Sequence, residues 1–204
     1  MPRPRSLTPD RLASAALAVL DRDGLAGLSM RTVAKELGMS TMALYRYVAD
    51  REELERLVVE FALGTIDTGA PPADLPWRER VEVMVRRLRD TLRTHPSVIP
   101  LSVAHRHHSR AVLRWSETVL GILTDTGFAG ERRVVALRSL VAYVNGALQL
   151  AWLGSLSGAG TVAISALDPE EFPLMAATAR SAQGVDAERE FFSGLAVLLR
   201  GLEP

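Results

Sequence analysis

The segment MRTVAKELGMSTMALYRYV, residues 30–48, constrains the fold of this chain more than any other stretch. Its apolar residues follow helical spacing on both sides of Gly38, so the segment predicts two short helices joined by a tight turn. Gly38 stands where such a turn needs a left-handed backbone, which costs glycine least. Ser40 is placed to cap the second helix, and Ala34 is small where the two helices approach most closely. The pattern predicts a helix-turn-helix.

The spacing of the second helix also separates its inward residues from its outward ones. Leu44 and Tyr47 are expected to face inward. They would join apolar residues of the preceding helix and turn, namely Val33, Leu37 and Met39. The outward positions then carry hydroxyl, methyl, aromatic and guanidinium groups: Thr41, Met42, Ala43, Tyr45 and Arg46. These groups suit base edges, thymine methyls and phosphates, whereas a solvated surface is the alternative for an isolated helix. The helix-turn-helix context favours DNA.

Helical periodicity continues along nearly the whole chain, which predicts an all-α protein. The triplet TPD, residues 8–10, supplies a cap, a first-turn proline and an acid for the first helix, and Gly24 ends it. Residues 154–167 are expected to form a flexible loop, after which DPEE, residues 168–171, restarts a helix. The expected helices cover residues 9–23, 29–37, 41–48, a stretch opened by Asp50, 77–94, 97–105, 110–127, 131–153, 169–180 and 186–202.

The proline-rich segment TGAPPADLP, residues 68–76, is the clearest domain boundary. It separates a three-helix head with the helix-turn-helix, residues 1–65, from a larger helical body, residues 75–204. The whole chain is expected to contain about nine or ten helices.

Composition narrows the chemistry. The 204 residues carry no net charge and no cysteine, which excludes disulfides, thiolate zinc sites and cysteine nucleophiles. The apolar run ASAALAVL, residues 13–20, follows Arg3 and Arg5 as in a secretion signal, but charged residues close it on both sides. No stretch approaches the roughly 20 uninterrupted apolar residues of a membrane span. The chain is therefore expected to be cytoplasmic and free of the membrane.

Residues 8–62 resemble the DNA-binding domain of the TetR family of bacterial transcriptional regulators, on the stretch GLSMRTVAKELGMSTMALYRYVADREELERLV. The body is similar to the tetracycline-repressor type of C-terminal domain in PWRERVEVMVRRLR, HPSV, TGF and YVNGALQ. The resemblance implies a DNA-binding regulator, usually a repressor, that leaves a palindromic operator when a small-molecule effector binds.

By position, the resemblance implies two sets of DNA contacts. The residues facing bases or the adjoining backbone would be Met30, Arg31, Thr41, Met42 and Ala43. The phosphate-binding residues would be Tyr45, Tyr47 and Arg51, with Ser40 beside them and Arg46 open between base and phosphate. Tyr47 could bury its ring and still present its hydroxyl. Residues 1–50 hold seven basic and five acidic side chains, a modest excess that fits a sequence-reading dimer.

Two body helices, at residues 134–153 and 186–202, are apolar on more than one side and should be buried on more than one side. The resemblance implies that they pair in a homodimer, although closing the core of one chain is the alternative. The expected interface is Val134, Leu137, Val141, Leu148, Phe191, Leu195 and Leu198. A two-fold dimer places its recognition helices about 34–36 Å apart, which predicts a palindromic operator.

Polar residues within the apolar body helices are candidates for the effector cavity, although a core or interface role is the alternative for each. They are His95, His105, Trp115, Asn145, Gln149, Trp152 and Met175. The cluster HRHH, residues 105–108, offers no good i, i+4 pair, so a solvated loop is favoured over a metal site. No metal or other cofactor is expected.

Enzyme motifs are weak. GAGTVA, residues 158–163, matches a dinucleotide fingerprint, but no strand precedes it. GSLSG misplaces its serine for a nucleophile elbow, and no paired carboxylates stand out. A helical protein-interaction module or a ligand-binding protein, in either case without specific DNA recognition, is the alternative function. The outward set of Arg31, Thr41 and Arg46 argues against it.

Overall fold

The computed structural model describes residues 7–203, and within that range it contains eleven α-helices, one 3-10 turn and no strand. The prediction of an all-α protein is confirmed. Arg3 and Arg5, with the rest of residues 1–6 of the predicted head, and Pro204 of the predicted body lie outside the described range. The head helices are α1 (Pro9–Gly27), α2 (Met30–Glu36), α3 (Thr41–Leu44) and α4 (Arg51–Leu63).

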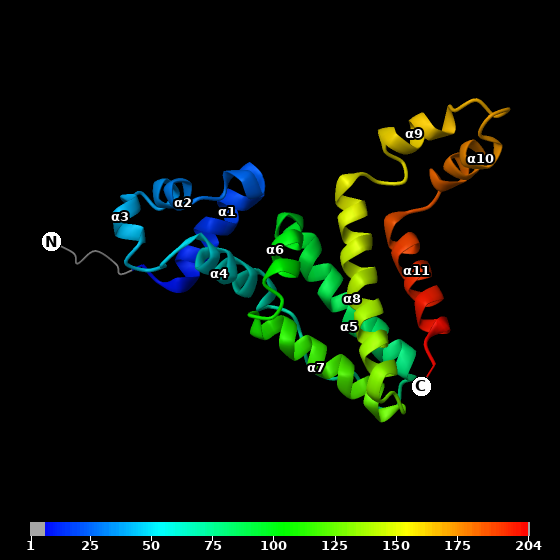
Figure 1. Ribbon diagram of the computed structural model, residues 1–204, viewed down its shortest axis with the longest axis horizontal. Coiled ribbons are helices and arrows are strands. Elements are labelled where there is room, and N and C mark those ends of the chain that lie inside the picture. Colours follow the sequence, from blue (N-terminus) through cyan, green and yellow to red (C-terminus); the bar gives the residue numbers. More distant parts are fainter. Residues whose placement is uncertain (1–6, 204) are drawn as a thin grey trace.

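The body begins with α5 after the proline-rich boundary. Its elements are α5 (Trp77–Thr94), η1 (Pro96–Val98), α6 (Ile99–Ala104), α7 (Arg110–Asp125), α8 (Gly130–Leu153), α9 (Ala159–Ser165), α10 (Pro173–Ala182) and α11 (Ala187–Gly201). Figure 1 shows α1–α4 at one end of an elongated molecule, with α4 joining them to the bundle of α5–α8. At the other end α8 and α11 diverge toward a pair formed by α9 and α10.

The first helix forms as its caps predict. The Thr8 hydroxyl accepts a hydrogen bond from the Arg11 backbone N–H at 3.3 Å, which satisfies one of the free donors of the first turn. Gly24 has φ of 68° and kinks the helix, where the sequence predicted its end. Leu12 and Leu20 are buried, and α1 packs against both α2 and α4, so α1 is the central element of the head core.

The body is organised around Trp115 of α7. Its ring is 1% exposed, and its indole N–H donates to the Met84 carbonyl of α5 at 2.8 Å. A buried indole needs such a partner for its single donor. The bond ties α7 to α5 and fixes one wall of the interior described below.

Helix α8 combines a packed face with an uncovered one. Ala136, Leu140, Val144 and Leu148 recur every four residues and are buried. By length and composition alone α8 is apolar enough to cross a membrane, and only 22% of its most apolar window is buried. The structure uses one face of α8 in the core and leaves other apolar residues accessible.

The segment between α8 and α11 differs from the prediction. The expected loop at residues 154–167 contains α9, which is the helix missing from the expected set. The helix expected from Pro169 begins at Pro173 instead. The Asp168 side chain accepts from the Glu170 backbone N–H at 2.9 Å, so residues 168–172 form a turn. Helices α9 and α10 pack mainly against each other.

Candidate nucleic-acid interface and ligand cavities

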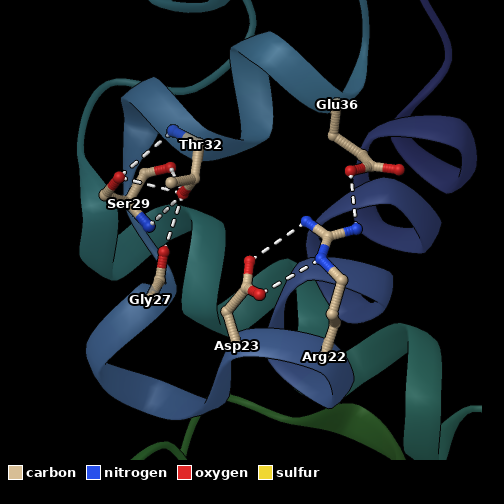
Figure 2. A network of polar contacts seen from close by, with 6 residues as sticks. All are labelled: Arg22, Asp23, Gly27, Ser29, Thr32 and Glu36. Atoms are coloured by element: carbon tan, nitrogen blue, oxygen red, sulfur yellow. Dashed lines mark hydrogen bonds and ion pairs between the residues drawn. The ribbon is translucent and has the colours of Figure 1, made fainter.

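The start of α2 is fixed by a reciprocal cap. The Ser29 hydroxyl accepts from the Thr32 backbone N–H at 3.1 Å, and the Thr32 hydroxyl oxygen accepts from the Ser29 N–H at 3.0 Å. The Thr32 hydroxyl also donates to the Gly27 carbonyl at 2.8 Å. Figure 2 shows these bonds at the junction of α1 and α2. The arrangement is a capping box with threonine in the place of the usual glutamate.

An ion-pair network joins the other end of α2 to α1. Arg22 bonds Asp23 on its own helix at 3.0 Å and Glu36 on α2 at 2.9 Å, as Figure 2 shows. The two carboxylates raise the pKa of Arg22. Because these groups are exposed, the network positions α2 more than it stabilises the head.

The turn of the helix-turn-helix forms as predicted. Gly38 has φ of 68°, and its N–H donates to the Lys35 carbonyl at 3.1 Å. The Met39 N–H donates to the Ala34 carbonyl at 2.9 Å. These two bonds constitute a Schellman motif, in which a left-handed residue reverses the chain. Ser40 then caps α3 by accepting from the Ala43 N–H at 3.2 Å, which confirms its predicted capping role.

The outward face of α3 is strongly exposed. Met42 is 75% exposed and Tyr45 is 47% exposed, whereas Leu44 is fully buried. The prediction that Tyr47 faces inward is wrong, because Tyr47 is 45% exposed and Val48 fills the core position with 1% exposure. Regular α-helix ends at Leu44. The backbone N–H groups of Arg46 and Tyr47 donate to carbonyls three residues back instead of four, and this tighter turn rotates the later side chains.

The positions predicted at the start of α2 have different fates. Met30 is 7% exposed and belongs to the hydrophobic core of the head, so it does not face DNA. Arg31 is exposed. Within residues 7–203, neither Arg31 nor Arg46 makes a side-chain hydrogen bond or ion pair, so both guanidinium groups are free for a ligand. Thr41 and Ala43 are half-buried at the foot of α3.

Arg51 is engaged within the head. Its Nε donates to the Glu55 carboxylate at 2.8 Å, and a terminal nitrogen donates to the Leu25 carbonyl at 3.1 Å. These bonds brace α4 against the end of α1. To contact a phosphate as predicted, Arg51 would have to use a guanidinium that already donates to Glu55 and to the Leu25 carbonyl.

Two of the predicted effector residues line one cavity. Trp115 and Asn145 border a space of about 400 Å³ enclosed by α5, α6, α7 and α8. Most of its wall is apolar, as in Leu88 and Val144, and Arg106, Glu117 and Arg138 contribute charged groups. An apolar cavity with a few polar groups is the usual form of a small-molecule site. Trp152 lines a second cavity of about 680 Å³ between α5, α8 and α11.

The remaining effector candidates lie elsewhere. His95 and His105 do not line the cavity of Trp115. Their ring nitrogens contact head carboxylates, His95 with Asp21 at 2.7 Å and His105 with Glu55 at 3.0 Å. Gln149 and Met175 are exposed and border neither of the two cavities, so these two predictions receive no support from the geometry.

The histidine cluster divides its members between different environments. His105 is buried, while His107 and His108 are exposed with ring centroids 4.1 Å apart. Over the described part of the chain, no group of three or more His, Cys, Asp or Glu side chains is placed to hold a metal ion.

The predicted dimer residues fall into two groups. Leu148, Phe191 and Leu195 are at most 5% exposed, because α8 and α11 pack against each other through them. Their assignment to a partner-facing surface is therefore wrong. Val134 is 60% exposed, and the half-buried members are Leu137, Val141 and Leu198. Exposed apolar residues that the prediction missed are Val135, Leu150, Leu153 and Val197.

A helix-turn-helix with exposed aromatic and cationic groups, on a helical body that contains cavities, defines a two-domain regulator of the DNA-binding class. Residues 12–56 match the family of bacterial regulatory proteins described as tetR, and residues 69–204 match the tetracyclin repressor-like C-terminal domain. The chain belongs to the TetR family of bacterial regulatory proteins.

Three relatives illustrate the range of similarity. The transcriptional repressor DrrR1 of Streptomyces coeruleorubidus is 35% identical over 146 residues, which is 72% of this chain and 54% of DrrR1. The chain thus matches only about half the length of that relative. ActR of Streptomyces coelicolor, solved with actinorhodin, superposes with a TM-score of 0.80 at 27% identity over 98% of this chain and 96% of ActR.

The third relative is BioQ of Mycobacterium smegmatis, with a TM-score of 0.70 and 28% identity over 97% of this chain and 98% of BioQ. BioQ has also been solved with its double-stranded DNA operator, and that chain superposes with a TM-score of 0.68 at 26% identity over 97% of this chain and 98% of BioQ.

Proposed function

We propose that this protein is a DNA-binding transcriptional repressor that a small-molecule effector releases from its operator. The observation that carries the proposal is the face of α3, where Leu44 and Val48 anchor the helix while Met42, Tyr45 and Arg46 project to solvent. Such a face combines an apolar group for thymine methyls with donors for phosphates. The repressor DrrR1, the DNA complex of BioQ and the actinorhodin complex of ActR support the assignment. Such a repressor acts in the cytoplasm, where the DNA lies.

The protein acts as a homodimer on a palindromic operator. The apolar residues exposed on α8 and α11 include Val135 at 51%, Leu150 at 65% and Val197 at 61%. Exposed Ala142 and Gly146 lie between Val135 and Leu150 on α8 and allow a second helix to approach closely. A two-fold pairing of these helices buries the same patch on both copies and presents two α3 helices to one DNA face.

The effector binds in the cavity lined by Trp115 and Asn145. Helix α6 contributes Ser102 and Val103 to that cavity, and His105, which follows α6, contacts Glu55 of α4. The Ser109 hydroxyl at the start of α7 donates to Glu60 of α4 at 2.7 Å. A ligand that displaces α6 therefore displaces α4 and with it the head. Release needs an affinity difference of a few kcal/mol between the two states.

The test is operator selection from random duplex DNA, followed by fluorescence anisotropy on the selected sequence. The wild-type protein selects a palindrome, and Arg31→Ala combined with Tyr45→Ala weakens binding by about 100-fold, since each lost contact is worth roughly 1–3 kcal/mol. Arg114→Ala is the matched control, because Arg114 is an exposed arginine on α7 that lies far from the head in sequence.

Light scattering must give the same dimer mass for all three proteins. If the wild type shows no preference over scrambled duplex, the regulator proposal is wrong, and a helical protein-interaction module becomes the better description.

A further inference from the structure

Arg89 of α5 is an arginine inside the body. The residue is 3% exposed, and its side chain lines the cavity of about 680 Å³ between α5, α8 and α11. A buried guanidinium is costly unless carboxylates or other acceptors surround it. The surroundings of Arg89 therefore indicate whether the protein itself neutralises this charge.

No well-placed carboxylate neutralises it. The closest acidic oxygen belongs to Asp90, the next residue on the same helix, at 3.5 Å, and the Asp90 side chain is mostly exposed. This is the only side-chain hydrogen bond of Arg89 within residues 7–203. Two other arginines of α5 differ, since Arg86 reaches Glu188 at 2.8 Å and Arg87 reaches Asp67 at 2.9 Å.

The other neighbours of Arg89 are aromatic rings and charged groups of both signs, since the charge of Glu188 on α11 also acts on it. Its guanidinium lies 4.9 Å from the ring centre of Phe191 and 5.0 Å from that of Phe192. Burial, followed by the charge of Arg93, lowers the pKa of Arg89. Arg93 also lines the cavity, and it makes no hydrogen bond or ion pair within the described range. Two guanidinium groups thus line one cavity, and within the described range neither forms an ion pair shorter than 3.5 Å.

The rest of the cavity wall is mainly apolar. Ile99, Ala147, Leu150 and Trp152 line it from α6 and α8. The one acidic residue in the lining is Glu190. Burial raises the pKa of the Tyr143 phenol, and the charge of Glu190 raises it further. The phenol donates to the Phe191 carbonyl at 2.5 Å, so it is engaged by the protein.

Close packing of α8 and α11 shapes this wall. A Cβ at Gly194 of α11 would overlap the Tyr143 hydroxyl, so glycine at this position lets the tyrosine ring lie under α11. The cavity therefore has an aromatic wall, formed by Tyr143 and Phe191, and a cationic end formed by Arg89 and Arg93 of α5.

We propose that this cavity binds a small organic anion with an aromatic or other apolar body, whose carboxylate pairs with Arg89 and Arg93. The planar guanidinium of Arg89 presents paired donors that match a carboxylate, and such charge-assisted bonds are stronger than neutral ones. The apolar body lies against Trp152, Leu150 and Phe191. This site differs from the Trp115 cavity proposed for the effector, and it stands whether or not the protein binds DNA. Its α8 wall at Ala142, Gly146 and Leu150 belongs to the face assigned to the homodimer, so the partner copy would close the open side of the site.

The experiment compares naphthalene-2-carboxylate with the neutral 2-naphthamide, which has nearly the same shape. Isothermal titration on the full-length protein gives the two affinities directly. In the wild type the carboxylate binds at least about tenfold more tightly than the amide, because hydrogen bonds to charged groups are the stronger ones. In Arg89→Met the preference disappears, while the methionine keeps apolar contact with Phe191 and Phe192.

Two control variants test where the carboxylate binds. Arg114→Met changes an exposed arginine on α7 and leaves the carboxylate preference unchanged. Arg89→Lys keeps a charge at the site and retains part of the preference. If Arg138→Met, in the Trp115 cavity, removes the preference and Arg89→Met does not, the anion binds in the other cavity and the proposal is overturned.

Stability of the ligand-free protein separates binding from a structural role. If the guanidinium awaits a ligand, Arg89→Met unfolds at the same temperature as the wild type or higher, since an uncompensated buried charge has been removed. A clear drop in melting temperature with equal affinities for acid and amide would overturn the proposal. None of these measurements involves DNA, so their failure leaves the proposed repressor function untouched.

Discussion

The α3 face of the head and the α8–α11 face of the body both expose large apolar side chains, but the residues beside those side chains differ. On α3, exposed Met42 and Tyr45 stand beside the unpaired guanidinium of Arg46. On α8, exposed Val135 and Leu150 stand beside Ala142 and Gly146. The first face suits a hydrated polyanion, and the second suits another apolar surface. Exposure alone therefore does not identify a partner, and the charge beside the exposed residue decides.

The largest effect is expected from charging the body face. Val135→Glu with Leu150→Glu places buried charges in the proposed dimer, while both residues are more than half exposed in the single chain. The dimer dissociates and operator affinity falls by about 100- to 10,000-fold, because the two heads no longer act as one bivalent ligand. Light scattering gives the mass and anisotropy gives the affinity. Ala129→Glu, at the exposed start of α8, is the control and changes neither.

The next effect separates the two sides of α3. Leu44→Ala empties a fully buried position of the head core and lowers the free energy of unfolding by about 2–5 kcal/mol. Met42→Ala removes a side chain that is 75% exposed and changes the free energy of unfolding by no more than roughly 0.5 kcal/mol. Urea denaturation measures both, and operator selection detects the altered sequence preference of Met42→Ala. Equal stability losses would contradict the assignment of the two faces.

A smaller effect compares two glycines. Gly38→Ala forces a β-carbon into the left-handed backbone of the turn and destabilises the protein by about 1–2 kcal/mol. Gly121→Ala, inside α7 with open space around the new methyl group, stabilises it by about 0.5–1 kcal/mol. Opposite shifts in melting temperature are the expected result. If both substitutions lowered the melting temperature, the loss at Gly38 could not be attributed to the left-handed turn.

The smallest effect concerns Tyr143, which burial and the charge of Glu190 hold above the ordinary phenol pKa. The unfolded chain loses the phenol proton near pH 10 and the folded chain at a higher pH. The resulting stabilisation is complete below about pH 10 and is lost as the pH rises through the folded pKa. Tyr143→Phe costs about 1 kcal/mol below pH 10, through the bond to Phe191, and its melting temperature falls less steeply above that pH. Identical alkaline profiles would exclude the raised pKa.

Local signals carried most of what was predictable. Thr8, Ser29, Ser40 and Gly38 were expected to begin or end helices, and each does so through bonds to residues only a few positions away. Capping and turn formation depend on neighbouring side chains and on backbone conformation, so a short stretch of sequence determines them. The same locality explains why the helix-turn-helix could be identified from residues 30–48.

Predictions that depended on which helix packs where were less successful. Phe191 and Leu195 were expected at a partner-facing surface and lie in the core of their own chain, while Met30 is in the head core. His95 and His105 were expected in a cavity and contact the head instead. In each case the residue type was compatible with both environments. The choice rests on contacts between segments that are distant in the sequence.

The environment of Arg89 was predictable in part from the local sequence and in part only from the tertiary structure. Its place four residues after buried Val85, on the apolar side of α5, is a sequence signal for a buried charge that the spacing alone could have revealed. Only the tertiary structure shows that no carboxylate of the described chain pairs closely with Arg89, because the possible partners come from α8, α11 and the loops between them. By itself the sequence determined most of the helices, their caps and the helix-turn-helix, since these depend on local periodicity and hydrogen bonding. Only the tertiary structure decided which apolar faces remain open and which charges remain unpaired, because both depend on distant segments packing side by side.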